Sequence, residues 1–159
     1  MMSNKFIRRA IELAKHSIDS GGGPFAAVIV KQGKIIGEGF NQVTQNNDPT
    51  AHAEIIAIRH ACKELSDYQL KDCIIYTSSE PCPMCLSAIY WSRLTQVYYA
   101  NSYQQAQSAG FDDQFIFEEL ALAHKHKKIN ISQIESTEVL EQASNIFTLW
   151  NNKIDKKEY

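Results

Sequence analysis

Two short motifs, far apart in the sequence, constrain this chain more than any other feature. One is the run EPCPMC at positions 80–85, and the other is HAE at positions 52–54. Two closely spaced cysteine thiolates and a distant histidine form a ligand set that zinc binds, and three protein ligands leave a fourth tetrahedral position open. We therefore predict a catalytic zinc site held by His52, Cys82 and Cys85. Glu54 is then a carboxylate beside the metal that is not needed as a ligand.

Two other interpretations of the cysteine pair are weaker. It could be half of a four-ligand structural zinc site, or a redox-active dithiol. The remaining cysteines, Cys62 and Cys73, stand alone and do not form a second pair of this spacing. A redox pair would not need His52 and Glu54 at the start of another helix. The combination therefore favours a catalytic metal.

Length and composition indicate one globular domain, residues 1–159, with residues 151–159 as a charged tail. Apolar residues make up 44% of the 159-residue chain and charged residues 21%, as in ordinary globular proteins. A formal net charge of −2 gives no basic surface for nucleic acid. No apolar run approaches the length of a membrane span. Cysteine ligands need a reducing compartment, so we predict a cytoplasmic protein without nucleic-acid or membrane partners.

Hydrophobic periodicity alternates between helical and strand patterns along the chain. The expected helices are 3–20, 50–65 with Thr50 as N-cap, 81–91 or 83–91, 115–123 and 138–150; the expected strands are 25–30, 35–41, 72–79, 96–100 and 129–134. Positions 31–34 read as a hairpin turn, and 42–49 and 111–113 as loops. This order predicts an α/β fold of three layers, α/β/α, with a mixed sheet of about five strands.

The expected elements place both motifs at helix starts. Residues at i and i+2 do not share a helix face, so His52 and Glu54 can flank one site only if it lies at the tip of their helix. The buried side of that helix is predicted as Ile55, Ile58, Ala61, Cys62 and Leu65. Cys82 and Cys85 begin another helix, where the N-terminal N–H groups and dipole favour thiolate over thiol.

At its HAE and PCPMC motifs the chain resembles the cytidine and deoxycytidylate deaminase superfamily, whose zinc signature has this form. Further stretches narrow the resemblance to the short bacterial guanine deaminases: GGPF at 22–25, NNDPTAHAE at 46–54, AIYW at 88–91, GFDD at 110–113 and KKEY at 156–159. The resemblance runs nearly the whole length. It implies a cytidine deaminase-like fold and the conversion of guanine to xanthine and ammonia.

The resemblance also implies a role for each motif residue. One zinc per chain would be held by His52, Cys82 and Cys85, with Glu54 as proton shuttle; guanine would meet Phe25, Asn41, Trp91, Asp113 and Tyr159. Asp112 competes with Asp113 for reading the purine, and the sequence does not separate them. The resemblance further implies a domain-swapped homodimer in which residues 151–159 close the neighbouring active site.

The implied reaction uses chemistry that suits these residue types. Zinc lowers the pKa of a bound water to about 7, and zinc-bound hydroxide can then add to C2 of guanine. Glu54 would take the water proton and deliver it to a ring nitrogen. An alternative from the same superfamily is a transfer-RNA adenosine deaminase, but it should carry a cationic surface for phosphates. A second alternative, a zinc-stabilised binding module without activity, does not explain Glu54 or the open ligand position.

Overall fold

The structure, a computed structural model, describes residues 2–158, and their side chains from residue 4 onward. It divides the chain into two compact units, Met1–Phe115 and Ile116–Tyr159. We predicted one domain, residues 1–159. The division into two units does not test that prediction, because it does not show whether the second unit folds by itself. No helix in the described part of the chain is long and apolar enough to cross a membrane.

The first unit is built on a mixed sheet. Its strands are β1 (Ala26–Lys31), β2 (Lys34–Phe40), β3 (Cys73–Ser79) and β4 (Gln96–Asn101). Their order across the sheet is β2-β1-β3-β4, with β1 antiparallel to both neighbours and β3 parallel to β4. The predicted hairpin between β1 and β2 is confirmed. Gln32 and Gly33 both have positive φ, as a tight two-residue turn requires.

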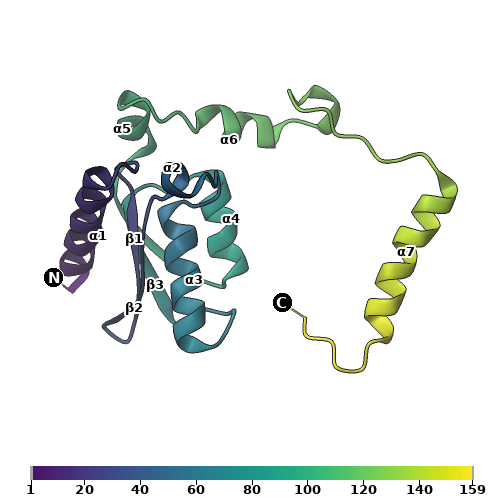
Figure 1. The fold of residues 1–159 in the computed structure, drawn as a ribbon, viewed down its shortest axis with the longest axis horizontal. Helices are drawn as coiled ribbons and strands as arrows, with labels where there is room; N and C mark the ends of the chain where they lie inside the picture. Colours follow the sequence, from purple (N-terminus) through teal and green to yellow (C-terminus); the bar gives the residue numbers. More distant parts are fainter. Residues whose placement is uncertain (1, 159) are drawn as a thin grey trace. The chain divides into compact units, whose positions relative to one another are not determined.

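Helices cover both faces of this sheet, so the α/β class is confirmed for the first unit. α1 (Met2–Asp19) packs on one face, and α3 (Ala53–Leu65) and α4 (Pro83–Trp91) lie on the other (Figure 1). The side chains of β1 alternate between the two layers. Ala27 and Ile29 join the core under α3, whereas Val28 and Val30 pack with Phe6 of α1.

Small residues bring α3 unusually close to the sheet. A Cβ at Gly39 would lie 2.2 Å from the Ala53 carbonyl oxygen, and one at Gly37 would lie 2.5 Å from that of Ala57. Buried positions on this helix are therefore mostly alanines: Ala53, Glu54, Ile56, Ala57 and Ala61. Of the predicted buried side, only Ala61 is fully buried, and the others, Ile55, Ile58, Cys62 and Leu65, are half-buried. A close approach leaves no room for larger side chains at the centre of the contact.

Three local predictions are wrong. The sheet has four strands among the described residues rather than about five, because 129–134 forms no strand there. Thr50 is not the N-cap of α3. Its N–H and hydroxyl both donate to Asp48 Oδ1 in a turn, at 2.8 and 2.7 Å, and the helix begins two residues later with His52 as N-cap. The predicted loop 42–49 contains a short helix, α2 (Val43–Asn46).

The remaining helices follow β4. They are α5 (Tyr103–Ser108), which the sequence did not predict, α6 (Gln114–Ala121), the 3₁₀ helix η1 (His124–His126) and α7 (Thr137–Asn152). The last two belong to the second unit, and α7 confirms the predicted helix 138–150. None of the described residues 116–158 is buried, although α7 is amphipathic. The second unit thus has regular structure without a core of its own.

Candidate metal centre and substrate cavity

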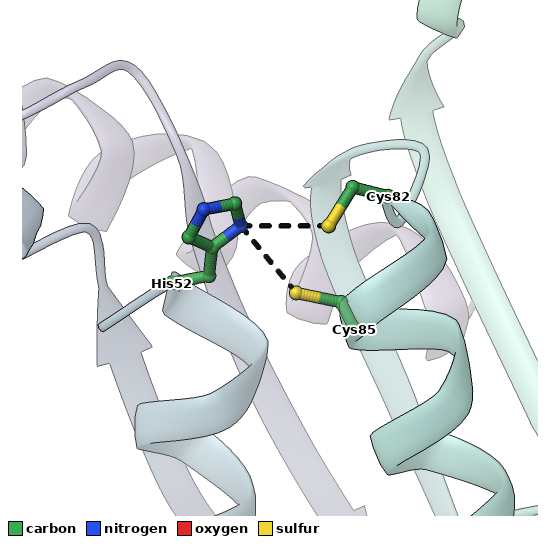
Figure 2. A group of neighbouring side chains, drawn as sticks. All are labelled: His52, Cys82 and Cys85. Atoms are coloured by element: carbon green, nitrogen blue, oxygen red, sulfur yellow. Dashed lines mark hydrogen bonds between the residues drawn. The ribbon is translucent and has the colours of Figure 1, made fainter. Parts of the chain in front are cut away.

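The three predicted ligands converge at the tips of two helices. The Nδ1 atom of His52 lies 3.6 Å from Cys82 Sγ and 3.6 Å from Cys85 Sγ. Figure 2 shows the imidazole facing both sulfurs across the gap between the helices. All three ligand atoms lie within 4.8 Å of one another, and these side chains are buried or half-buried. The sequence motifs therefore meet in space as predicted.

These distances suit a tetrahedral zinc ion. Zinc binds thiolate sulfur at about 2.3 Å and imidazole nitrogen at about 2.0–2.1 Å, which at a tetrahedral angle separates the nitrogen and sulfur by roughly 3.6 Å. The separation in the structure has this value for both cysteines. Two sulfurs and one nitrogen also form the donor set that zinc prefers. His52, Cys82 and Cys85 can therefore hold one zinc ion per chain, with one coordination position left for water or substrate.

Local backbone structure explains why the ligands face each other. His52 is the N-cap of α3 and Cys82 the N-cap of α4, both in extended conformation, and Pro83 occupies the first turn of α4. Because His52 precedes the first turn, it and Glu54 can flank one site despite their i, i+2 spacing. The geometric condition set by the sequence is thus met, because His52 and Cys82 lie at the tips of their helices.

The electrostatics of the sulfurs favour cation binding. A hydrogen bond with Cys85, with desolvation opposing it, lowers the pKa of Cys82 to about 4. The same hydrogen bond, together with burial, raises the pKa of Cys85. The hydrogen bond with Cys82 raises the pKa of His52. A lowered pKa favours the thiolate form of Cys82 at neutral pH, and a negatively charged sulfur favours cation binding.

Glu54 lies beside the ligands and is almost completely buried, with 7% of its surface exposed. Burial raises the pKa of its carboxyl group to about 6, while hydrogen bonds to its own backbone and to the Cys85 thiol oppose that rise. A carboxyl group with a pKa near neutrality can both accept and release a proton. This is the property that a proton shuttle needs.

A cavity of about 390 Å³ opens at the ligands, within the size range of small-molecule sites. Of the predicted site residues, it brings together Phe25, Asn41, His52, Glu54, Cys82 and Asp113, with Cys85 adjoining. Asp112 lines the cavity as well. The rest of the wall comes from residues that the sequence reasoning gave no role: Gly23, Val43, Thr44, Glu80, Gly110 and Phe111. Glu80, next to the PCPMC motif, is the charged side chain among these, and its position in the motif run could have drawn attention to it.

Asn41 and Phe25 are held in place at one side of this cavity. Asn41 is buried, and its Oδ1 accepts hydrogen bonds from the N–H groups of Gly23 and Val43, at 3.4 and 3.3 Å. With the oxygen engaged, the side-chain NH₂ is the group that can donate to a purine. The Phe25 ring meets the Phe111 ring edge-on with centroids 4.7 Å apart.

The two neighbouring aspartates have different surroundings. Asp112 is exposed, and its Oδ1 accepts hydrogen bonds from Gln107 Nε2 and from the Gln114 N–H, at 3.3 and 3.1 Å. Asp113 is half-buried, and desolvation, with a contribution from Cys82, raises the pKa of its carboxyl group. Both aspartates line the cavity. Asp112 is engaged in hydrogen bonds at the start of α6, whereas the charges of Cys82 and His52 act on Asp113. These surroundings favour Asp113 as the purine-reading carboxylate, which stays a prediction.

The remaining two predicted substrate contacts are Trp91, which does not line the cavity, and Tyr159. Trp91 is the last residue of α4, about 13 Å from its cysteine end at 1.5 Å per residue, and its side chain is 62% exposed. Its position in the helix does not support packing against a purine in this cavity. Tyr159 lies outside the described residues, so its contact with the purine stays a prediction.

Comparison with known proteins agrees with this geometry. Residues 2–101 match the profile of the cytidine and deoxycytidylate deaminase zinc-binding region. The chain is 52% identical to guanine deaminase of Bacillus subtilis over 100% of both chains. The crystal structure of guanine deaminase from that organism superposes with a TM-score of 0.91 at 53% identity, covering 98% of each chain. The transfer-RNA-specific adenosine deaminase of Aquifex aeolicus is 41% identical over 60% of this chain and 63% of its own length.

Proposed function

We propose that this chain, which belongs to the cytidine and deoxycytidylate deaminase family, hydrolyses guanine to xanthine and ammonia. The observation that carries the proposal is the full-length similarity to a guanine deaminase, since the zinc motifs alone are common to deaminases of several substrates. The cavity at the ligand triad supports it, because the wall carries both a donor, Asn41, and an acceptor, Asp113, for a purine ring.

The chain's own residues account for the proton movements of the reaction. His52, Cys82 and Cys85 would hold the zinc ion, which would supply an activated water molecule at neutral pH. Glu54 takes the proton of the attacking water and passes it to the ring nitrogen beside C2 of guanine. Glu54 then takes the proton of the new hydroxyl group on C2, which becomes a carbonyl, and delivers it to the amino group, which leaves as ammonia. The burial of Glu54 keeps these transfers away from solvent.

Recognition of the purine is divided between the two sides of the cavity. The NH₂ group of Asn41 donates to a ring or carbonyl acceptor, and the Asp113 carboxylate accepts from ring N–H groups. Phe25 supplies an aromatic surface for the ring, and its contact with Phe111 fixes that surface. Trp91 does not line this cavity, so the structure gives no support to its predicted contact with the purine.

One substrate panel tests the proposal. Ammonia release is measured from guanine, adenine, cytosine, cytidine and a transfer-RNA anticodon stem with the same zinc-loaded protein. We expect guanine to be the preferred substrate by kcat/KM. A preference for the anticodon stem would mean that the protein acts on transfer RNA and not on free guanine. Ammonia release from none of the five substrates would contradict the proposal. The formal net charge of −2 already argues against a phosphate-binding surface.

The protein also acts, in our proposal, as a domain-swapped homodimer. The second unit has an amphipathic helix but no buried residue, so its apolar side needs a surface that it does not itself provide. In the first unit, β4 is also poorly covered, with five of its six residues exposed. A partner chain that receives the second unit would cover such surfaces. The tail 151–159 would then close the partner's cavity, with Tyr159 at the purine.

The compartment follows from the ligands. Two thiolates serve as metal ligands only while they stay reduced, and reducing conditions prevail in the cytoplasm. We therefore place the protein there.

A further inference from the structure

Helix α5 lacks the packing that normally stabilises so short an element. It has six residues, and none of them is buried. Isolated helices of this length do not persist in water, because too few hydrogen bonds offset the cost of nucleation. Contacts at its ends must therefore hold it in place.

Glu80 provides such a contact at the start of α5. Its Oε2 accepts a hydrogen bond from the Tyr103 N–H at 3.1 Å, the first N–H group of the helix. The backbone of Glu80 is fixed independently, because its N–H donates to the Asn101 carbonyl oxygen at 2.8 Å and so extends the pairing of β3 with β4. The carboxylate thus ties the segment that leads into the cysteine motif to the beginning of α5.

The other end of α5 carries the loop with the purine-reading carboxylate. The Phe111 N–H donates to the Ala106 carbonyl oxygen at 3.0 Å, and Gln107 Nε2 donates to Asp112 Oδ1 at 3.3 Å. These bonds connect the helix to the loop immediately before Asp113. A shift or fraying of α5 would therefore displace Asp113 relative to the metal ligands.

We infer that Glu80 is a positioning residue for the deamination: its carboxylate anchors α5 to the cysteine segment and thereby holds Asp113 at the correct distance from the zinc site. The inference rests on the proposed function. Glu80 lines the cavity, but its role here is that of a hydrogen-bond acceptor for a backbone N–H and not of a proton carrier. It acts on substrate through Asp113.

The first test replaces the acceptor. Glu80→Ala should raise KM for guanine by roughly tenfold, the effect of losing one charge-assisted hydrogen bond, and change kcat by less than about twofold. The effect falls on KM because ordering the loop assists ground state and transition state alike. Zinc content should stay at one per chain.

Two further variants serve as controls. Glu80→Gln keeps an acceptor oxygen and should retain most of the affinity for guanine. Glu64→Ala changes an exposed glutamate on α3 and should leave KM unchanged.

The second test removes the donor instead. Tyr103 is the first residue of α5, where proline is tolerated, and Ser102 before it already has the extended conformation that a following proline requires. Tyr103→Pro deletes the N–H group, and Tyr103→Ala, which keeps it, corrects for the lost ring. Relative to Tyr103→Ala, the proline variant should raise KM like Glu80→Ala. Combining it with Glu80→Ala should add little, because both changes break the same bond.

A substrate-independent measurement separates this inference from the proposed function. Amide hydrogen exchange in residues 103–113 should be faster in Glu80→Ala than in the wild type, with β1 and β3 unchanged. Absence of guanine turnover in the wild type would defeat the proposed function, while the exchange data would still decide the anchoring. The inference is overturned by unchanged exchange at 103–113, by multiplicative effects of Glu80→Ala and Tyr103→Pro, or by a Glu80→Gln variant as defective as Glu80→Ala.

Discussion

The two units of this protein use apolar residues in opposite ways. In the first, Val28, Ile29 and Ile75 are fully buried between the sheet and its helices. In the second, Ile146 is 63% exposed and Phe147 is 72% exposed. Both units have helices with an apolar stripe, so periodicity alone produces a helix but does not produce a core. The contrast teaches that the described residues of the second unit form helices without burying their apolar side, and the proposed partner chain would cover that side.

If the chemistry belongs to the first unit, the largest loss should come from a single buried carboxylate there. Glu54→Gln should lower kcat for guanine by about 10²–10⁴-fold, because glutamine has a similar shape but cannot carry the proton. Zinc content, measured by metal analysis, should stay the same. As a control, Glu141→Gln makes the same substitution at an exposed position of α7 and should leave turnover unchanged. Near-normal turnover in Glu54→Gln would mean that another group moves the proton.

A matched pair of truncations tests the contrast in packing. Ile75→Ala opens a cavity in the core of the first unit and should lower the free energy of unfolding by about 2–5 kcal/mol, measured by urea denaturation. Ile146→Ala in α7 should cost at most about 0.5 kcal/mol in a monomer, because an exposed side chain loses little packing.

The same pair also tests the proposed dimer. If α7 packs on a partner chain, Ile146→Ala should weaken the association of subunits, measured by sedimentation equilibrium across a range of protein concentrations. Ile75→Ala is internal to the first unit and should not weaken association of the folded protein. A wild type that remains monomeric at high concentration would contradict the proposed dimer.

Within the first unit, the two neighbouring aspartates should differ in their effect on catalysis. Asp113→Asn should reduce kcat/KM for guanine by the equivalent of about 1.5–3 kcal/mol, the contribution of a charge-assisted hydrogen bond, and should leave zinc bound. Asp112→Asn should have a smaller effect, because that side chain contacts Gln107 and the start of α6. A larger effect of Asp112→Asn would exchange the two roles.

The smallest of these effects concerns the tail. A chain that ends at Lys156 should keep zinc and remain dimeric but lose guanine turnover by about tenfold, because an open cavity admits water and leaves the ring less fixed. Mixing it with full-length Glu54→Gln chains should restore activity, since the intact Glu54 then meets the complete tail of the partner. No recovery, with subunit exchange demonstrated, would mean that each tail serves its own chain.

Much of the first unit could be predicted from the sequence because its signals are local. The stripe of α1, the turn at 31–34 and the alternation along β1 each depend on residues a few positions apart. The ligand set was also predictable, since the residue types and spacing of His52, Cys82 and Cys85 define zinc chemistry without coordinates. The helical periodicity of 138–150 predicted α7 equally well.

Other features required the tertiary structure because they depend on what each residue meets. The alternation at 129–134 predicted a strand, but a strand forms only when another strand pairs with it. Thr50 had the type of an N-cap, yet its bonds to Asp48 moved the start of α3 to His52. The approach of α3 over Gly37 and Gly39 arises from contacts between residues far apart in the sequence. The difference between Asp112 and Asp113 combines local hydrogen bonds of Asp112 with the nearness of Asp113 to the distant Cys82. The sequence by itself determined the candidate ligands and the type of chemistry that they suit, while only the folded chain decided which neighbouring side chains line the cavity.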